Sequence, residues 1–146
     1  MATLKISDLS VGDWVRYDNG VTPYSIRSIV RTGDQECVVL KDNMYPDGIT
    51  GFVKYLKPTP ITAEILGNNG FEFEKASRWH ICELEDKTKI NVWIGRNNEG
   101  RIEVSKPDPF DNGYHFKYAD IEVLNIAVHQ LQHALRLAGV DKEINL

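Results

Sequence analysis

The clearest hydrophobic pattern in the chain is a stripe near its C-terminus. Apolar residues recur there at steps of three and four: Ile121, Leu124, Val128, Leu131, Leu135 and Ala138. Only a helix brings side chains at this spacing to one face. The pattern predicts a helix that begins between Asp120 and Asn125 and ends at Ala138, with Gly139 just beyond its last turn. Such a helix is only marginally stable alone in water, so we expect it to pack on a sheet.

Short strand-like runs fill the N-terminal part of the chain. They are Trp14–Tyr17, Tyr24–Val30, Cys37–Leu40 and Ile49–Val53. Turn signals separate these runs, among them Asn19-Gly20, because asparagine and glycine tolerate a positive φ. Four or five short strands at this spacing predict a small closed or half-closed β-barrel over residues 1–57.

A proline-containing connector, residues 58–73, follows the predicted barrel. Pro58 and Pro60 lack an amide donor and restrict the residue before them, so the segment favours neither a helix nor a central strand and marks a boundary. Thr62 then fits the N-cap of a short helix over Ala63–Leu66.

Residues 74–146 contain a second group of strand patterns before the helix. The strand-like runs are Trp79–Leu84, Ile90–Ile94, Ile102–Val104 and Tyr114–Tyr118, and Lys106–Gly113 is predicted as a loop. Within the second run, Ile90 and Val92 face one side while Asn91 and Trp93 face the other. This pattern predicts an antiparallel meander whose apolar face is covered by the C-terminal helix.

The opening of the chain resembles SH3-like barrels. A short turn and a Gly-Asp pair precede the first strand in Leu9–Val15, and the apolar groups Ile26–Ile29 and Val38–Leu40 follow as a meander. Together with the patterns above, the resemblance implies an α+β, mostly β fold. A small SH3-like N-terminal barrel is followed by an antiparallel β-meander packed by one C-terminal amphipathic helix. A binding role is implied by analogy with such barrels, not by the residues.

Two further segments resemble a family of short, uncharacterised bacterial proteins, many of which look like products of mobile elements or prophages. The segments are Val128–Ile144, which contains the sequence VHQLQHALRLAG, and Pro58–Leu66 with the later Gly70-Phe71. They occur in matching order along the chain. The resemblance implies no activity, and it carries over no catalytic residue.

The composition limits the classes of protein to which this chain can belong. The 17 basic and 21 acidic residues among 146 give a net charge of −4, which disfavours a broad phosphate-binding surface. Cys37 and Cys82 are isolated in apolar runs; we expect two reduced, buried thiols, with a disulfide between them as the alternative. No apolar run approaches membrane-spanning length, and Met1–Leu9 lacks the apolar core of a signal peptide. We therefore expect a cytoplasmic location and no membrane partner.

Aromatic and basic residues occur together in the predicted barrel and provide a candidate binding site. Its residues are Trp14, Tyr17, Tyr24, Arg27, Phe52 and Lys54. Aromatic side chains beside basic ones form the stacking platforms of proteins that bind single-stranded nucleic acids. The alternative is that most of these aromatics are core residues or cross-strand partners.

The C-terminal helix carries weak candidates for a metal site. His129 and His133 are four residues apart, so they share one helix face and could share a metal. However, Gln130 occupies the position of the glutamate in the HExxH pattern, and no further ligand is fixed nearby. Asp108 and Asp111 lie among Pro, Asn and Gly, which favours turn residues over an acid–base pair. We therefore predict no metal, no cofactor and no catalytic site.

These observations predict a non-enzymatic binding or structural accessory protein of phage or mobile-element origin. It is expected to act through contacts with a protein partner or with copies of itself in a homo-oligomer. A nucleic-acid-binding module that uses the barrel face is the second hypothesis. A metal-dependent hydrolase centred on His129 and His133 is the third.

Overall fold

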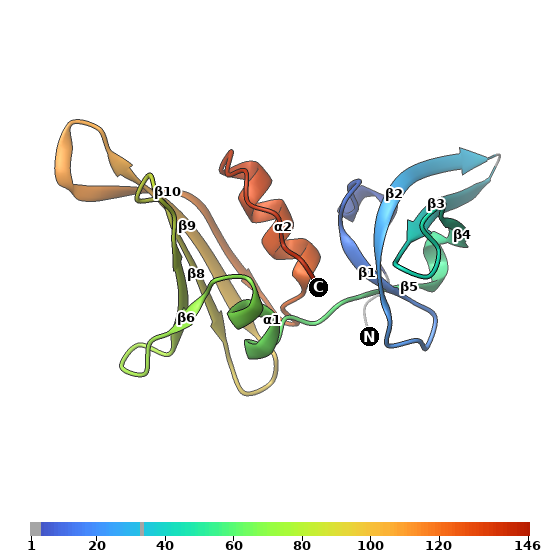
Figure 1. Ribbon diagram of the computed structural model, residues 1–146, viewed down its shortest axis with the longest axis horizontal. Helices are drawn as coiled ribbons and strands as arrows, with labels where there is room; N and C mark the ends of the chain where they lie inside the picture. Colours follow the sequence, from blue (N-terminus) through green and yellow to red (C-terminus); the bar gives the residue numbers. More distant parts are fainter. Residues whose placement is uncertain (1–3, 33) are drawn as a thin grey trace. The chain divides into compact units, whose positions relative to one another are not determined.

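A computed structural model describes residues 4–32 and 34–146 of the chain. Within these residues it contains two five-stranded antiparallel sheets and a C-terminal helix (Figure 1). The chain divides into two compact units, Met1–Thr59 and Pro60–Leu146, which we call unit 1 and unit 2. The predicted α+β, mostly β class is confirmed.

Unit 1 is a five-stranded antiparallel sheet in which the first four strands form a meander and the fifth returns beside the first. The strands are β1 (Trp14–Tyr17), β2 (Pro23–Thr32), β3 (Gln35–Lys41), β4 (Ile49–Phe52) and β5 (Leu56–Pro58), with single 3₁₀ turns η1 (Ile6–Asp8) and η2 (Val53–Tyr55). Their order in the sheet is β4-β3-β2-β1-β5, so β4 and β5 lie at opposite edges. No pairing joins those two edges in the described part of the chain, and the closure expected of a barrel is therefore not observed.

Alternation along the strands sets the core of unit 1. Its buried members are Leu4, Leu9, Val15, Ile26, Val38, Leu40, Val53 and Leu56. In β1, Val15 faces this core and Tyr17 packs against it, whereas Trp14 and Arg16 occupy the alternate positions. Tyr24 pairs with Val15 across the strands and also packs on the core.

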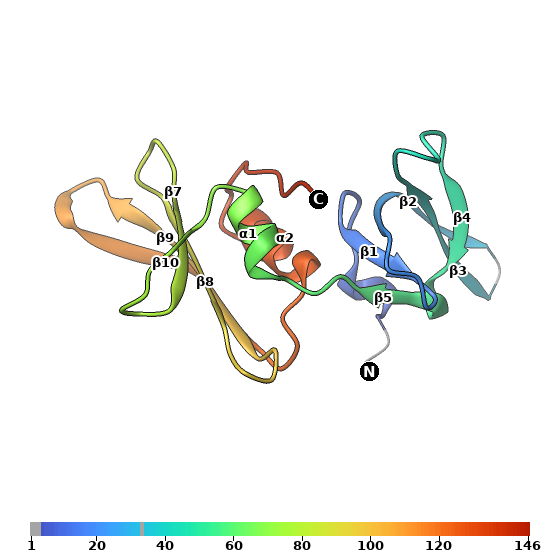
Figure 2. The same cartoon turned by 60° about the horizontal axis from the view of Figure 1, so that its bottom comes forward.

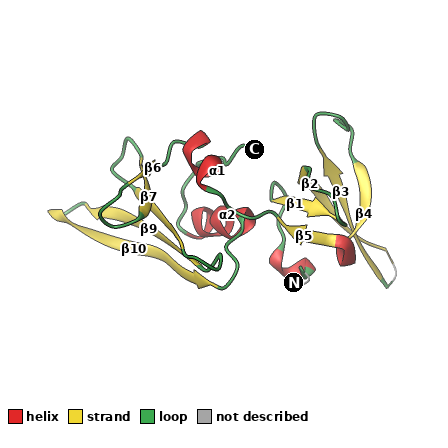
Figure 3. Cartoon of the chain, turned by 90° about the horizontal axis from the view of Figure 1, so that it is seen from below, coloured by secondary structure: helices red, strands yellow, loops and turns green. Residues whose placement is uncertain are grey.

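Unit 2 combines a second meander with two helices. The strands are β6 (Glu72–Phe73), β7 (Trp79–Glu83), β8 (Lys89–Ile94), β9 (Gly100–Asp108) and β10 (Asp111–Val123), and the helices are α1 (Ala63–Asn68) and α2 (Val128–Leu137). The strand order β10-β9-β8-β7-β6 follows the chain. Helix α2 lies along one face of the sheet and contacts β9 and β10 (Figures 1 and 3).

The hairpin of β9 and β10 is longer than predicted and extends beyond the other strands (Figure 2). The prediction of a loop over Lys106–Gly113 is therefore wrong: most of the segment is strand, and the turn lies at Pro109 and Phe110. Pro107 is tolerated in β9 because pairing with β8 ends at Ser105, so no ladder hydrogen bond to β8 is lost. Asp108 is the last residue of β9, and its Oδ1 accepts from the Phe110 N–H of the turn at 2.9 Å.

Helix α2 confirms the core of the predicted stripe and corrects its start. Val128, Leu131, Leu135 and Ala138 are buried as predicted. Ile121, however, belongs to β10 and pairs with Ile102 of β9. Its neighbour in the stripe, Leu124, is 84% exposed in the turn that follows β10.

The ends of α2 have clear local causes. At its start, the side chain of Gln130 accepts from the Ala127 N–H at 2.9 Å, so one amide of the first turn is satisfied. At its end, Gly139 has φ +68°, as predicted for the residue after the last turn. The Gly139 N–H donates to the Arg136 carbonyl and the Val140 N–H to the Leu135 carbonyl, which is the Schellman arrangement.

The connector contains the predicted short helix. Thr62 caps α1, because its Oγ1 accepts from the Ile65 N–H at 3.2 Å. The helix continues to Asn68, two residues beyond the predicted end. Phe71, after α1, is buried in unit 2.

Two further sequence predictions concern the thiols and the membrane. Cys37 and Cys82 are both buried free cysteines, as predicted. Burial raises the pKa of the Cys82 thiol, and Lys142 partly opposes this shift. None of the helices in residues 4–32 and 34–146 is long and apolar enough to cross a membrane.

Candidate functional site

The sheet of unit 2 has two chemically different faces. On the face that α2 covers, Ile90, Val92, Ile102 and Val104 are fully buried. Asn91 and Trp93 occupy the alternate positions of β8 and are only partly buried, so the predicted division of this strand between two faces is confirmed. The partly exposed face is where the candidate site lies.

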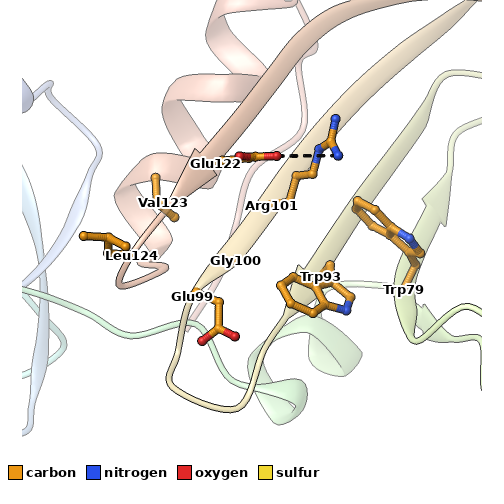
Figure 4. A pocket seen from close by; sticks show the side chains of 8 residues that line it. All are labelled: Trp79, Trp93, Glu99, Gly100, Arg101, Glu122, Val123 and Leu124. Carbon is orange, nitrogen blue, oxygen red and sulfur yellow. Dashed lines mark ion pairs between the residues drawn. The ribbon is translucent and has the colours of Figure 1, made fainter.

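One row of side chains crosses four neighbouring strands on this face. Trp79 of β7 pairs with Trp93 of β8, Trp93 with Arg101 of β9, and Arg101 with Glu122 of β10. Directly paired residues lie on the same side of an antiparallel sheet, so the two indoles, the guanidinium and the carboxylate are brought together. Figure 4 shows these four side chains along the row.

The row forms the floor of an open groove of about 630 Å³. Its lining residues are Trp79, Trp93, Glu99, Gly100, Arg101, Glu122, Val123 and Leu124. Volumes of this order are typical of ligand sites. Both indoles are partly exposed, and the exposed Leu124 adds an apolar rim beside Val123 (Figure 4).

Three residues of the β8–β9 hairpin have conformations or contacts that shape this part of the groove. Gly100 has no room for a side chain, because a Cβ there would lie 2.5 Å from Ile126 Cδ1 and 2.9 Å from the Trp93 carbonyl oxygen. Glu99 is held in the loop, because its Oε2 accepts from the Asn97 N–H at 2.8 Å. Asn98 has φ +62°, a conformation that asparagine tolerates better than most residues.

Arg101 is the centre of a charge network. Its Nε and Nη2 donate to the two carboxylate oxygens of Asp120 at 2.9 and 2.8 Å. Glu103 lies 3.2 Å from the same guanidinium and Glu122 lies 3.6 Å from it. The hydrogen bonds to Asp120 raise the pKa of Arg101, and the same contact holds the pKa of Asp120 below its ordinary value. Both groups are therefore charged at neutral pH.

Negative charge exceeds positive charge at the groove. Lys117 joins the network through Glu103 at 3.1 Å and Asp120 at 3.6 Å. Two cations thus face three carboxylates in the network, and Glu99 adds a fourth at the groove. The described lining supplies indoles, carboxylates and one guanidinium, but neither a thiol, a hydroxyl nor an imidazole.

The predicted site in unit 1 is only partly assembled. Tyr17, Phe52 and Lys54 come together with Tyr55, a residue of η2. Tyr55 lies edge-on to Tyr17 and to Phe52, with ring centroids 6.0 and 6.3 Å apart. Lys54 Nζ lies 5.0 Å from the Tyr55 ring centroid and 5.7 Å from that of Phe52. We call these four residues the unit 1 aromatic cluster.

The other three predicted residues of unit 1 have different positions. Tyr24 packs on the core, and Trp14 occupies the face of β1 opposite Val15. Arg27 Nη1 donates to the Asp47 carbonyl at 2.8 Å and so ties down the loop before β4. The six predicted residues therefore do not line one groove.

The two histidines of α2 lie side by side. The rings of His129 and His133 meet edge-on with centroids 5.6 Å apart, and His129 is buried. Among the residues that the structure describes, no group of three or more His, Cys, Asp or Glu side chains could hold a metal ion. Asp111 is, with Asp108, the second residue of the candidate acid–base pair, and its side chain lies outside the described part of the chain.

Sequence reasoning did not identify the groove as a site. Its one visible signal was Trp93, a large aromatic residue in the polar phase of an alternating strand. The partnership of Trp93 with Trp79, Arg101 and Glu122 depends on strand register, which spacing along the chain does not reveal.

Fold and site together define a mostly β chain with an aromatic, acidic groove on the sheet face opposite a helix. No protein-family model, no curated protein and no solved structure matches the chain.

Proposed function

We propose that this chain is a non-enzymatic binding protein and that the unit 2 groove is its recognition surface for a protein partner. The observation that carries the proposal is the pair Trp79 and Trp93, partly exposed side by side on the floor of the groove. Tryptophan contributes a large contact area and is enriched among the residues that dominate binding energy in protein interfaces.

The packing of unit 2 supports this proposal. The apolar face of the sheet is already covered by α2, so the core does not need two indoles on the opposite face. Large aromatic residues gathered in an exposed patch are more informative than scattered ones, because such patches often mark interaction sites. The lining carboxylates and guanidinium resemble the polar surroundings expected at an interface rim.

We also propose that unit 1 is an SH3-like barrel, supported by β5 returning beside β1 at the end of the meander. A phage or mobile-element origin remains a proposal that the sequence of Val128–Ile144 supports. Self-association is a further candidate for the protein contact.

A random peptide library displayed on phage, selected on the full chain, tests the proposed function. We expect enriched peptides to bind the wild-type protein and to lose about tenfold or more in affinity on the W93A variant, which removes an indole from the groove. The W14F variant is the matched control, because Trp14 lies in unit 1. Circular dichroism verifies that each variant is folded.

Two results would contradict the proposed function. One is a set of enriched peptides that bind W93A as tightly as wild type; the other is no enrichment over an unrelated protein. If light scattering shows a dimer that W93A converts to a monomer, the partner is a second copy of the chain, and the groove keeps its proposed role.

A second candidate function is nucleic-acid binding by the unit 1 aromatic cluster. The observation that favours it is the position of Lys54 over two aromatic rings, of which Phe52 is 38% and Tyr55 42% exposed. Bases stack on such rings while a lysine contacts phosphate. Fluorescence anisotropy with random single-stranded DNA at two salt concentrations tests it: binding must weaken with salt and with Y55A. Unchanged anisotropy would exclude this candidate.

A further inference from the structure

We propose that the group bound in the unit 2 groove is a cationic side chain, arginine or lysine, presented by a basic segment of the partner. This inference rests on the proposed function of the groove and names the chemistry of its ligand. It follows from three observations: the charge balance of the groove, the exposure of the Glu122 carboxylate, and the two indoles.

The charge balance favours a cation. The lining of the groove holds two carboxylates, Glu99 and Glu122, and one guanidinium, that of Arg101. Arg101 cannot readily serve an incoming anion, because its Nε and Nη2 already form a bidentate pair with Asp120. A phosphate or a carboxylate entering the groove would therefore meet net repulsion, whereas a cation would be attracted.

Glu122 is the carboxylate best placed for a new partner. Its side chain is 76% exposed and its distance to Arg101 is 3.6 Å, longer than the contact of Asp120 with the same guanidinium. An exposed pair of this kind contributes little to stability, so little is lost when Glu122 turns to another cation. Glu99 provides a second carboxylate at the groove (Figure 4).

The indoles provide the second half of the recognition. The face of an indole attracts ammonium and guanidinium groups, and tryptophan does so most strongly among the aromatic residues. Trp79 and Trp93 stand beside each other in the row that ends at Glu122. A cation over these rings can reach a carboxylate, while the methylene stem of its side chain contacts Val123 and Leu124 on the rim.

The test uses tryptophan fluorescence in the W14F variant, in which Trp79 and Trp93 are the remaining tryptophans of the chain's three. Short capped peptides containing arginine, lysine, citrulline or glutamate are titrated at constant ionic strength. Citrulline keeps the shape of arginine but carries no charge. We expect saturable changes with arginine and lysine, and affinity lower by about tenfold for citrulline.

Charge-neutral variants locate the effect in the groove. E122Q and E99Q are each expected to weaken arginine-peptide binding by roughly threefold to tenfold. E85Q is the matched control: it removes the same charge from an exposed residue of the β7–β8 turn that does not line the groove, and it should leave binding unchanged. The same titration on wild-type protein, followed by the indole N–H signals in NMR spectra, replaces the fluorescence assay if W14F fails to fold.

The outcomes separate the inference from the proposed function. Equal binding of citrulline and arginine peptides, or equal weakening by E122Q and E85Q, overturns the cationic ligand. Absence of arginine- and lysine-peptide binding also overturns it. If library peptides bind the groove but lack basic residues, the binding function stands and the cation inference is wrong; if no library peptide depends on Trp93, the proposed function itself fails.

Discussion

Asn69 joins two parts of unit 2 that are far apart in the sequence. Its Nδ2 donates to the Ile65 carbonyl and to the Asn145 carbonyl, both at 2.8 Å, and its Oδ1 accepts from the Asn145 N–H at 2.8 Å. The side chain is buried, so these bonds are shielded from water. One amide group thus holds the C-terminal tail against α1.

We predict that N69A lowers the free energy of unfolding by about 2–3 kcal/mol, because three buried hydrogen bonds are lost and their partners stay desolvated. Chemical denaturation measures this change. N68A is the matched control, since Asn68 is the exposed last residue of α1 and directly precedes Asn69. Equal effects of the two substitutions would show that the hydrogen bonds of the Asn69 side chain contribute nothing to the free energy of unfolding.

His80 makes the stability of unit 2 depend on pH. It is buried in β7 beside Phe73 of the edge strand β6, with ring centroids 4.9 Å apart, and burial lowers its pKa from the ordinary value of 6.5. A lowered histidine pKa means that the folded state binds fewer protons than the unfolded state. Above about pH 6.5 His80 is neutral in both the folded and the unfolded state. The free energy of unfolding decreases as the pH falls below that value, because the unfolded state then takes up a proton more readily.

We predict that the free energy of unfolding falls between about pH 7.5 and about pH 5 and that H80L reduces this fall. Denaturation curves at several pH values measure both. The Asp120 carboxylate does not interfere, because its pKa lies below the ordinary 3.8 and its contribution is lost only at more acidic pH. An identical pH dependence in H80L would contradict the assignment to His80.

At the scale of single residues, the sequence predicted several local roles correctly. Thr62 caps α1 and Gly139 ends α2, because capping and positive φ depend on neighbours close in the chain. The six binding residues predicted in unit 1 do not form one surface, because Tyr24 and Arg27 serve the core and a loop instead. Whether an aromatic residue is core or surface depends on which partner strand covers it.

At the scale of elements, α2 is stabilised through one face. Leu131 is buried on the sheet, whereas Leu137 is 73% exposed although it lies in the same helix. Both residues are leucines with the same helix propensity. The difference in their exposure therefore comes from which face of α2 packs on the sheet.

We predict that L131A costs roughly 2–5 kcal/mol of stability and L137A no more than about 0.5 kcal/mol. Thermal and chemical unfolding of the two variants measure the contrast. A similar cost for both would mean that α2 does not dock through the stripe that contains Leu131.

The predicted start of this helix was wrong for a reason that belongs to the sheet. Ile121 and Leu124 continue the spacing of the stripe, but Ile121 lies in β10, whose residues Ala119–Val123 pair with β9. Ile121 and Val123 are β-branched and suit a strand, and Asp120 pairs with Arg101 instead of capping a helix. Helical periodicity alone did not distinguish the last strand from the helix after it.

At the scale of the whole molecule, each unit has its own buried core. Unit 1 is built around residues such as Val15 and Leu40, and unit 2 around residues such as Val92 and Leu131. The division falls between Thr59 and Pro60, within the predicted connector. The pairing of Pro60 with Ala127 belongs to unit 2.

We predict that residues 60–146, produced alone, fold and unfold cooperatively, because their buried apolar residues and both helices are retained. A dispersed NMR spectrum and a sigmoidal denaturation curve are the expected results. A fragment that shows neither would mean that its core requires unit 1.

The sequence by itself determined the local features of this protein: the strand-forming runs, the Thr62 cap of α1, the Gly139 end of α2, the apolar stripe of α2 and the two-faced pattern of β8. These follow from interactions between residues a few positions apart. The tertiary structure decided strand register, the length of the last hairpin and the meeting of Trp79, Trp93, Arg101 and Glu122. Those features depend on pairings between residues that are distant in the chain, such as Arg101 and Glu122, 21 positions apart, and such pairings are chosen by packing of the whole sheet.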